Sequence, residues 1–151
     1  MNELTLIQAE RACERLIHRS VRLIDAYDYE GVLRLWAVDG VMTALGKDHV
    51  GHAGLRAWLN GREKDLICRH FVSNTIIDVI EKDRATGHSY ATAYRIRGWR
   101  GREPGPMNLP SYVLEYADSF RRDPDLGWLI TRRDVTVVIA GVEQRQALLA
   151  R

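Results

Sequence analysis

The sequence is poor in the residues that mark several special classes of protein, and cysteine is the first of these. Cys13 and Cys68 are the only cysteines among 151 residues, and they stand too far apart to form a recognisable metal-ligand spacing. We expect both to be reduced thiols of a cytoplasmic protein, buried as small apolar side chains. The cysteines therefore give no reason to predict a metal site or a cysteine nucleophile.

An excess of one charge and a long apolar run are also lacking. The 22 basic and 20 acidic residues nearly cancel, and no basic run or aromatic platform predicts nucleic-acid binding. No stretch approaches the ~20 apolar residues that span a bilayer, and the charged N-terminal sequence predicts no secretion signal. We therefore expect neither a nucleic acid nor a membrane as a partner.

Motifs for nucleotide binding, serine hydrolysis and metal binding are missing as well. The sequence contains no GxGxxG, P-loop or GxSxG motif. His49 and His52 are three residues apart, but that spacing alone does not predict a metal site. We predict no metal and no cofactor.

The sequence does contain a change of pattern from helices to long strands. Apolar residues at helical spacing give way to segments rich in β-branched residues. The expected elements are helices over residues 4–27, 32–36 and 52–61, strands over 41–45, 68–81, 85–99, 111–122 and 127–139, and a short helix in the last ten residues. Helices followed by antiparallel strands predict a single α+β domain over residues 1–151, with the helices covering one face of a curved sheet. A strongly bent sheet folded over a helix leaves a conical cavity that suits a small apolar ligand.

A histidine lies in the middle of the first long strand, in the sequence CRHFVSN. His70 shares one strand face with Cys68, Val72 and Asn74, but the opposite face is also partly apolar, so the periodicity does not settle which face is inside. His70 is either a structural residue or a group that titrates in a pocket. A carboxylate on one ring nitrogen would make the other nitrogen a better base.

The candidate for that carboxylate is Asp28. It follows the first predicted helix, where an acidic side chain opposes the helix dipole. Asp25 lies one turn earlier and could equally cap the helix or face solvent. The alternative for Asp28 is an ordinary loop residue.

An arginine interrupts the last predicted strand, WLITRRDVTVVI. Arg133 falls on a strand face that is otherwise almost wholly apolar. A buried guanidinium must be paired or fully hydrogen-bonded, because desolvating an unpaired charge is costly. It is either one half of a structural salt bridge with an internal carboxylate, or an anchor for a ligand oxygen or a developing negative charge.

Four segments together resemble the nuclear transport factor 2-like superfamily and its SnoaL-like branch. These segments are AYDYEGVLRLW, CRHFVSN, ATAYRIRGW and SFRRDPDLGWLITRR, and the resemblance covers most of residues 5–137. It implies a conical barrel in which N-terminal helices pack on a strongly curved, mostly antiparallel sheet, with a pocket at the wide end. It also implies a homo-oligomer, either a dimer or a trimer.

Within that superfamily the catalytic pattern is similar to that of scytalone dehydratase and hexachlorocyclohexane dehydrochlorinase, which pair an Asp after the first helix with a His on a later strand. Asp28 and His70 fall on those two positions. Tyr27 matches a tyrosine of the dehydratase, and Arg133 matches an arginine of the dehydrochlorinase. The dehydrochlorinase lysine would fall at Leu23, and the second pocket tyrosine and histidine of the dehydratase are missing, so the resemblance does not carry over either substrate.

The resemblance implies a lyase or isomerase that acts on a small, largely apolar cyclic substrate. Asp28 would orient His70, neutral His70 would remove a proton, Arg133 would stabilise the resulting negative charge, and Tyr27 would hold the departing oxygen. The expected pocket walls are Trp36, Asn74, Tyr90, Tyr94 and Tyr112. The alternative is a non-catalytic ligand-binding or assembly module, such as a small subunit of a ring-hydroxylating dioxygenase.

Overall fold

The computed structural model describes residues 2–150, and one long helix dominates the first part of the chain. Helix α1 spans Glu3–Asp25 and is capped by Asn2, whose side-chain oxygen accepts a hydrogen bond from the Thr5 backbone N–H at 2.9 Å. The buried residues of α1 recur every three or four positions, so the helix has one apolar face. Two shorter helices follow, α2 at Tyr29–Leu33 and α3 at Gly51–Asn60. The predicted helix over residues 4–27 is confirmed, although it ends two residues earlier.

Six strands form one sheet in the order β2-β1-β6-β5-β4-β3. The strands are β1 at Trp36–Ala44, β2 at Lys47–Val50, β3 at Leu66–Glu81, β4 at Arg84–Arg97, β5 at Tyr112–Asp123 and β6 at Gly127–Ala140. All neighbouring strands are antiparallel except β1 and β6, which run parallel. The four long predicted strands are confirmed. The short strand β2 was not predicted, because its four residues are mostly polar and carry no apolar alternation.

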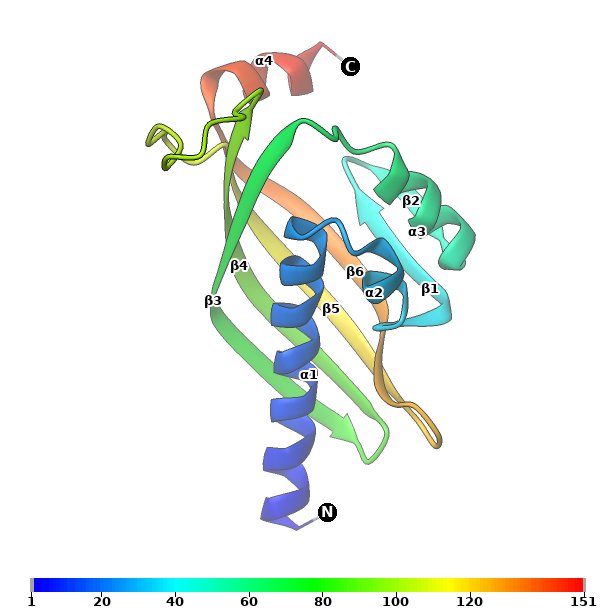
Figure 1. Ribbon diagram of the computed structural model, residues 1–151. Coiled ribbons are helices and arrows are strands. Elements are labelled where there is room, and N and C mark those ends of the chain that lie inside the picture. Colours follow the sequence, from blue (N-terminus) through cyan, green and yellow to red (C-terminus); the bar gives the residue numbers. More distant parts are fainter. Residues whose placement is uncertain (1, 151) are drawn as a thin grey trace.

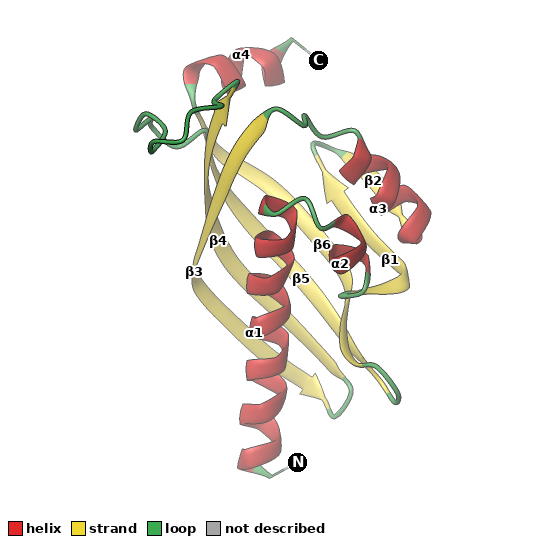
Figure 2. Ribbon diagram, in the orientation of Figure 1, coloured by secondary structure: helices red, strands yellow, loops and turns green. Residues whose placement is uncertain are grey.

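Helix α1 lies across the concave face of the curved sheet, with α2 and α3 beside it (Figures 1 and 2). Helix α4, at Val142–Leu149, lies at the end of the sheet near the loop that joins β4 and β5. The last ten residues therefore contain the predicted short helix. The expected α+β architecture, with helices on one face of a curved and mostly antiparallel sheet, is confirmed.

A β-bulge in β3 decides which residues of that strand face the interior. The register with β4 shifts between Ser73 and Ile76, and Asn74 has a positive φ of 51°. Before the bulge Cys68 and His70 point inward, and after it the inward face changes to odd-numbered residues such as Ile77. A single extra residue has this effect because side chains alternate along a strand with a period of two.

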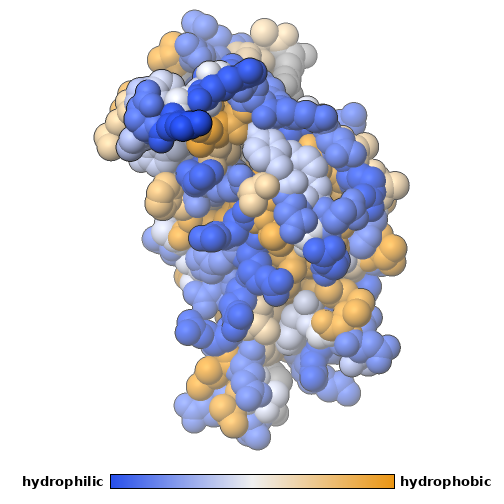
Figure 3. All heavy atoms as spheres, in the orientation of Figure 1, coloured by the Kyte–Doolittle hydropathy of each residue, from blue (hydrophilic) through white to orange (hydrophobic). Residues whose placement is uncertain are grey.

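The apolar core fills the space between α1 and the sheet. Ile17 of α1 and Ile130 of β6 are fully buried in it, and Phe120 of β5 packs in the same cluster. The face of the molecule in Figure 3 is mainly hydrophilic, with apolar residues scattered over it. Among residues 2–150, no helix is both long and apolar enough to cross a membrane.

Candidate active site

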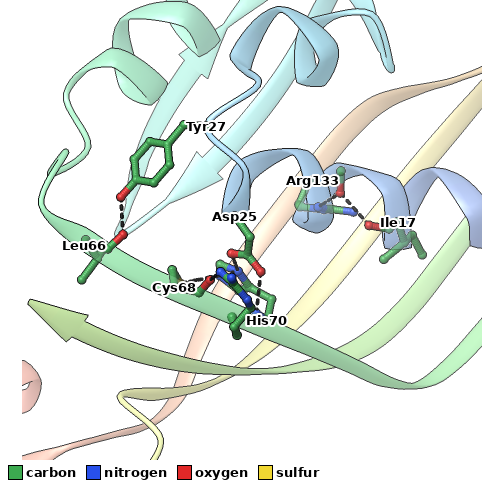
Figure 4. A network of polar contacts seen from close by, with 9 residues as sticks. Ile17, Asp25, Tyr27, Leu66, Cys68, His70 and Arg133 are labelled. Carbon is green, nitrogen blue, oxygen red and sulfur yellow. Dashed lines mark hydrogen bonds and ion pairs between the residues drawn. The ribbon is translucent and has the colours of Figure 1, made fainter. Parts of the chain in front are cut away.

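His70 and Asp25 form a close pair where the end of α1 meets β3 (Figure 4). His70 Nδ1 lies 2.6 Å from Asp25 Oδ1, and the His70 backbone N–H donates to Asp25 Oδ2 at 2.8 Å. The two side chains are only 10% and 11% exposed. A carboxylate that accepts two hydrogen bonds from one residue fixes both the ring orientation and the tautomer, because Nδ1 then carries a proton.

The position of β3 in the sheet makes this pairing possible. Strand β3 is an edge strand and pairs only with β4. An edge strand has backbone groups without a partner strand, and proteins usually cover such an edge. Here Asp25 is the last residue of α1, and its carboxylate accepts a hydrogen bond from the backbone N–H of His70. The end of α1 thus provides a hydrogen-bond acceptor for a backbone N–H at the edge of the sheet, and it places a carboxylate beside the imidazole of His70.

The sequence-based choice of Asp28 as the partner of His70 was wrong. The chain reverses directly after α1, with Tyr27 at a positive φ of 58° and hydrogen bonds from Tyr27 and Asp28 N–H back to carbonyls of α1, which is a Schellman turn. Beyond this turn Asp28 is exposed and caps α2, where its side chain accepts from the Gly31 N–H at 2.8 Å. Its role is therefore local to the second helix.

Tyr27 uses its hydroxyl to hold the start of β3. The hydroxyl lies within hydrogen-bonding reach of the Leu66 carbonyl (Figure 4). It also lies 3.0 Å from the Glu63 carbonyl oxygen. The hydroxyl proton is therefore engaged with the main chain. This contact anchors the strand that carries His70.

Cys68 lies next to the pair, on the same face of β3. Its Sγ is 3.7 Å from Nδ1 and 4.0 Å from Nε2 of His70, and the cysteine is 2% exposed. Burial acts to lower the pKa of His70, but the hydrogen bond to Asp25 and the neighbouring Cys68 outweigh it and raise that pKa to about 9. Sequence reasoning placed Cys68 on the His70 face but gave it no role, and it considered Asp25 only as a cap or a solvent-facing residue.

Arg133 is a structural residue that joins the sheet to α1. Its Nε and Nη2 donate to the two carboxylate oxygens of Asp118 at 2.7 and 3.0 Å, and Nη1 donates to the Ser20 hydroxyl at 2.9 Å. Its guanidinium also lies 4.5 Å from the centre of the Tyr116 ring. Arg133 is 3% exposed. The expectation of a buried salt bridge is confirmed, and the alternative of a free anchor for negative charge is not supported, because an internal carboxylate already neutralises the guanidinium.

Two of the predicted pocket walls lie on the opposite face of the sheet from His70. His70 is directly opposite Ala93 in the β3–β4 ladder, and residues in direct opposition share a face. Tyr94 follows Ala93 and therefore points outward, as does Tyr90, and both are exposed. The prediction that these tyrosines line a pocket with His70 was wrong, because the inward positions of β4 belong to small residues such as Ala91 and Ala93.

The remaining predicted wall residues are divided among different places. Asn74 is the exposed bulge residue of β3, so its assignment to the His70 pocket was also wrong. Tyr112 of β5 is directly opposite Ala93, so it shares the inner face with His70. Trp36 is 4% exposed at the start of β1 and belongs to the core.

Two hollows in the described part of the chain lie away from the Asp25–His70 pair. One, of about 470 Å³, is formed by α1 and by Trp128 of β6. The other, of about 290 Å³, lies on the outer face of the sheet and includes Asn74 and Tyr90. Neither is the conical cavity predicted around His70. The pair itself reaches solvent only through a small exposed area.

Comparison with known proteins gives one family and several related folds. The family model of the SnoaL-like domain matches residues 5–134. A search of curated proteins finds no match. Among solved structures, an NTF2-like protein with a cystatin-like fold from Novosphingobium aromaticivorans is 28% identical, with a TM-score of 0.75 over 97% of this chain and 92% of the other.

Two further solved structures share the fold at lower sequence identity. A scytalone dehydratase-like protein from Novosphingobium aromaticivorans is 19% identical, with a TM-score of 0.77 over 91% of this chain and 89% of the other. A hexachlorocyclohexane dehydrochlorinase, LinA type 2, is 13% identical, with a TM-score of 0.75 over 93% and 92%. The same fold therefore occurs in proteins named for the elimination of water and of hydrogen chloride.

Proposed function

The chain belongs to the SnoaL-like domain family, and we propose that it is a cofactor-independent lyase of the dehydratase type, acting on a small, largely apolar cyclic compound. The observation that supports this proposal is the Asp25–His70 pair, with its 2.6 Å contact between Oδ1 and Nδ1. A histidine held in one tautomer by a carboxylate is a common arrangement for general-base catalysis.

In the proposed reaction, Asp25 accepts a hydrogen bond from Nδ1–H of neutral His70, which leaves the unprotonated Nε2 as the base. Nε2 removes a proton from a carbon next to a carbonyl or another activating group. The electrons of the broken C–H bond form a C=C bond, and the bond to the leaving group on the neighbouring carbon breaks. Protonated His70 then returns its proton to a departing hydroxyl, which leaves as water. This last step replaces the role expected for Tyr27, whose hydroxyl holds the main chain.

Arg133 contributes to the proposed site by positioning. It ties Ser20 of α1 to Asp118 of β5 and so fixes the helix relative to the sheet. In the sequence analysis, the lysine of the dehydrochlorinase was placed at Leu23, five residues before Asp28. Ser20 lies five residues before Asp25. Because the acid that contacts His70 is Asp25 and not Asp28, the position of that lysine falls on Ser20. A serine that holds an arginine in place of a lysine argues against the dehydrochlorinase substrate.

The decisive experiment compares three single substitutions. His70→Gln and Asp25→Asn should each lower turnover by roughly 10² to 10⁴, the usual contribution of a positioned general base. Asp28→Asn should leave turnover unchanged, because Asn is as good a helix N-cap as Asp and residue 28 does not contact His70. The assay follows a panel of cyclic β-hydroxy ketones and polyhalogenated cycloalkanes by the absorbance of the new double bond and by halide release. Turnover retained in His70→Gln would contradict the mechanism.

The second candidate function is a non-catalytic binding or assembly module, and a different observation favours it. The two hollows described above lie away from His70, and Phe71 and Ile76 on the outer face of the sheet are more than half exposed. Under this alternative the Asp25–His70 pair would only join α1 to β3. No turnover of the panel, together with the loss of thermal stability in Asp25→Asn, would favour the module.

A further inference from the structure

We infer that Asp25, Cys68 and His70 form a binding site for a thiophilic divalent cation such as Zn²⁺. One carboxylate oxygen, one sulfur and one ring nitrogen from these residues all lie within 4.8 Å of one another (Figure 4). Zn²⁺ favours such a mixture of thiolate, imidazole and carboxylate ligands. The site was not apparent in the sequence, because its acid comes from a helix 43 residues before the cysteine.

The distance between the sulfur and the ring nitrogen is close to that of a tetrahedral zinc site, and the distance between the ring nitrogen and the carboxylate oxygen is shorter. With ordinary zinc bond lengths, the edge between sulfur and nitrogen is about 3.6 Å and the edge between nitrogen and oxygen about 3.4 Å. The Cys68 Sγ to His70 Nδ1 distance is already 3.7 Å. The Nδ1 to Asp25 Oδ1 distance of 2.6 Å is a hydrogen bond, so the ring and the carboxylate must move apart by less than 1 Å when the metal replaces the proton. The ring must also turn, because Sγ lies 4.0 Å from Nε2 and thus beside the ring.

The surroundings hold the ligands in place for a metal. Asp25 Oδ2 accepts the His70 backbone N–H at 2.8 Å, so the carboxylate stays oriented while Oδ1 turns to the ion. Hydrogen bonds of this kind to a ligating carboxylate strengthen metal sites. Three protein ligands leave the fourth tetrahedral position for water or another small ligand. The 10–11% exposure of His70 and Asp25 gives the ion a route from solvent.

Metal binding at this site has a proton balance and a consequence for activity. In the imidazolium form of His70, the cation displaces the Nδ1 proton and the proton of the Cys68 thiol; both protons go to solvent, and Nε2 keeps its proton. The affinity for metal should therefore rise with pH. The consequence for activity rests on the proposed function: a cation on Nδ1 removes the Asp25 contact that orients the base, so micromolar Zn²⁺ should inhibit the lyase.

The test of binding uses Co²⁺ as a spectroscopic probe and needs no substrate. Metal-free wild-type protein titrated with Co²⁺ should develop a near-ultraviolet band from charge transfer between the thiolate and cobalt, together with visible bands of a tetrahedral ion, and Zn²⁺ should abolish both. Cys68→Ala should lose the charge-transfer band. The matched control is Cys13→Ala, which removes the other buried thiol on α1 and should keep the band.

The affinity of the remaining ligands is measured in the same titration. Asp25→Asn should weaken Co²⁺ binding by at least about tenfold, since even residues that only support a ligand contribute 10- to 100-fold, and circular dichroism checks that each variant is folded. A missing band in wild-type protein, a band that persists in Cys68→Ala, or unchanged affinity in Asp25→Asn would overturn the inference. Retained turnover in His70→Gln with a normal cobalt band in wild-type protein would instead overturn only the lyase proposal.

Discussion

The charge state of His70 depends on opposing influences within a few ångströms of its ring. Burial favours the neutral imidazole and lowers the pKa, whereas the hydrogen bond to Asp25 and the contact with Cys68 favour the cation and raise the pKa to about 9. An unfolded histidine titrates near 6.5. Because the folded value is higher, protonated His70 stabilises the fold fully below about pH 6.5, and this contribution is lost as the pH rises through about 9.

We predict that an NMR titration of the His70 ring protons will show a midpoint near pH 9 in the wild-type protein. In Asp25→Asn the midpoint should fall, because the carboxylate that favours the cation is gone while the burial that lowers the pKa remains. Asp28→Asn is the control, because the Asp28 side chain caps α2 and does not contact His70, so the His70 midpoint should stay as in the wild-type protein. An unchanged His70 midpoint in Asp25→Asn would show that the acid does not control the imidazole.

The same pKa sets the expected pH dependence of the proposed reaction. If neutral His70 is the base, kcat/KM should rise about tenfold per pH unit below 9 and level off above it. A profile that falls through pH 9 would mean that His70 acts first as an acid. The measurement is kcat/KM across pH 6 to 10 on whichever panel compound is turned over.

At the scale of elements, the Arg133–Asp118 ion pair connects three parts of the fold. Arg133 is on β6, Asp118 is on β5, and Ser20, which accepts from Arg133, is on α1. The Ser20 hydroxyl in turn donates to the Ile17 carbonyl at 2.7 Å. All three guanidinium nitrogens therefore have partners, as burial of an arginine requires. The pair fixes the helix whose last residue is the acid of the proposed site.

We predict that Arg133→Met will lower the free energy of unfolding by about 3–5 kcal/mol, because it leaves the buried carboxylate of Asp118 unpaired. The double variant Arg133→Met/Asp118→Leu should recover most of this loss, since an apolar pair of similar size removes the unpaired charge. Arg132→Met is the control, because Arg132 pairs with Asp134 at the surface and should cost at most about 1 kcal/mol. Urea denaturation measures all three, and equal losses in the Arg132 and Arg133 variants would contradict the prediction.

The bulge in β3 is a second feature at the scale of elements, because it determines which residues of the strand face the interior. Asn74 has a positive φ of 51°, which asparagine and glycine tolerate and β-branched residues do not. We predict that Asn74→Val will destabilise the protein by about 1–3 kcal/mol, whereas Asn74→Gly will change stability by less than about 1 kcal/mol. Urea denaturation compares the two, and a Val variant as stable as the Gly variant would show that the bulge is not constrained.

At the scale of the whole molecule, the outer face of the sheet carries exposed apolar side chains near one edge. Phe71 is 62% and Ile76 63% exposed, and Tyr94 packs edge-on against Phe71 with 5.8 Å between ring centres. Clustered exposed apolar residues usually mark an interaction surface. The family resemblance led us to expect a dimer or trimer, and this face is the surface through which we propose that two copies meet.

We predict that sedimentation of the wild-type protein will show a dimer or trimer and that Phe71→Glu will shift it toward the monomer, because a buried charge without a partner is costly. Met107→Glu is the matched control, since Met107 is 97% exposed in the loop between β4 and β5 and should not change the association. A monomeric wild-type protein, or an unchanged oligomer in Phe71→Glu, would contradict the proposed surface.

The sequence by itself determined the long helix, the four long strands, their order and the inward direction of Arg133. These features depend on local periodicity: residues three or four apart share a helix face and alternate residues share a strand face, so apolar spacing alone predicts which side is buried. The α+β arrangement and the burial of Arg133 followed from this pattern, whereas its ion pair with Asp118 was one of two alternatives that the structure decided. The sequence missed the short strand β2, and it placed the second helix over residues 32–36, where the structure has α2 at Tyr29–Leu33 and starts β1 at Trp36.

Only the tertiary structure decided which acid meets His70. The sequence offered Asp25 and Asp28 three residues apart, and the choice depended on the exact end of α1 and on the Schellman turn at Tyr27, which directs Asp28 to α2. The bulge at Asn74 likewise changed the inward face of β3 partway along the strand. Both results depend on chain reversals and register shifts of one or two residues. Such shifts are small in sequence but rotate side chains to opposite faces, so periodicity could not predict the contact between Asp25 and His70.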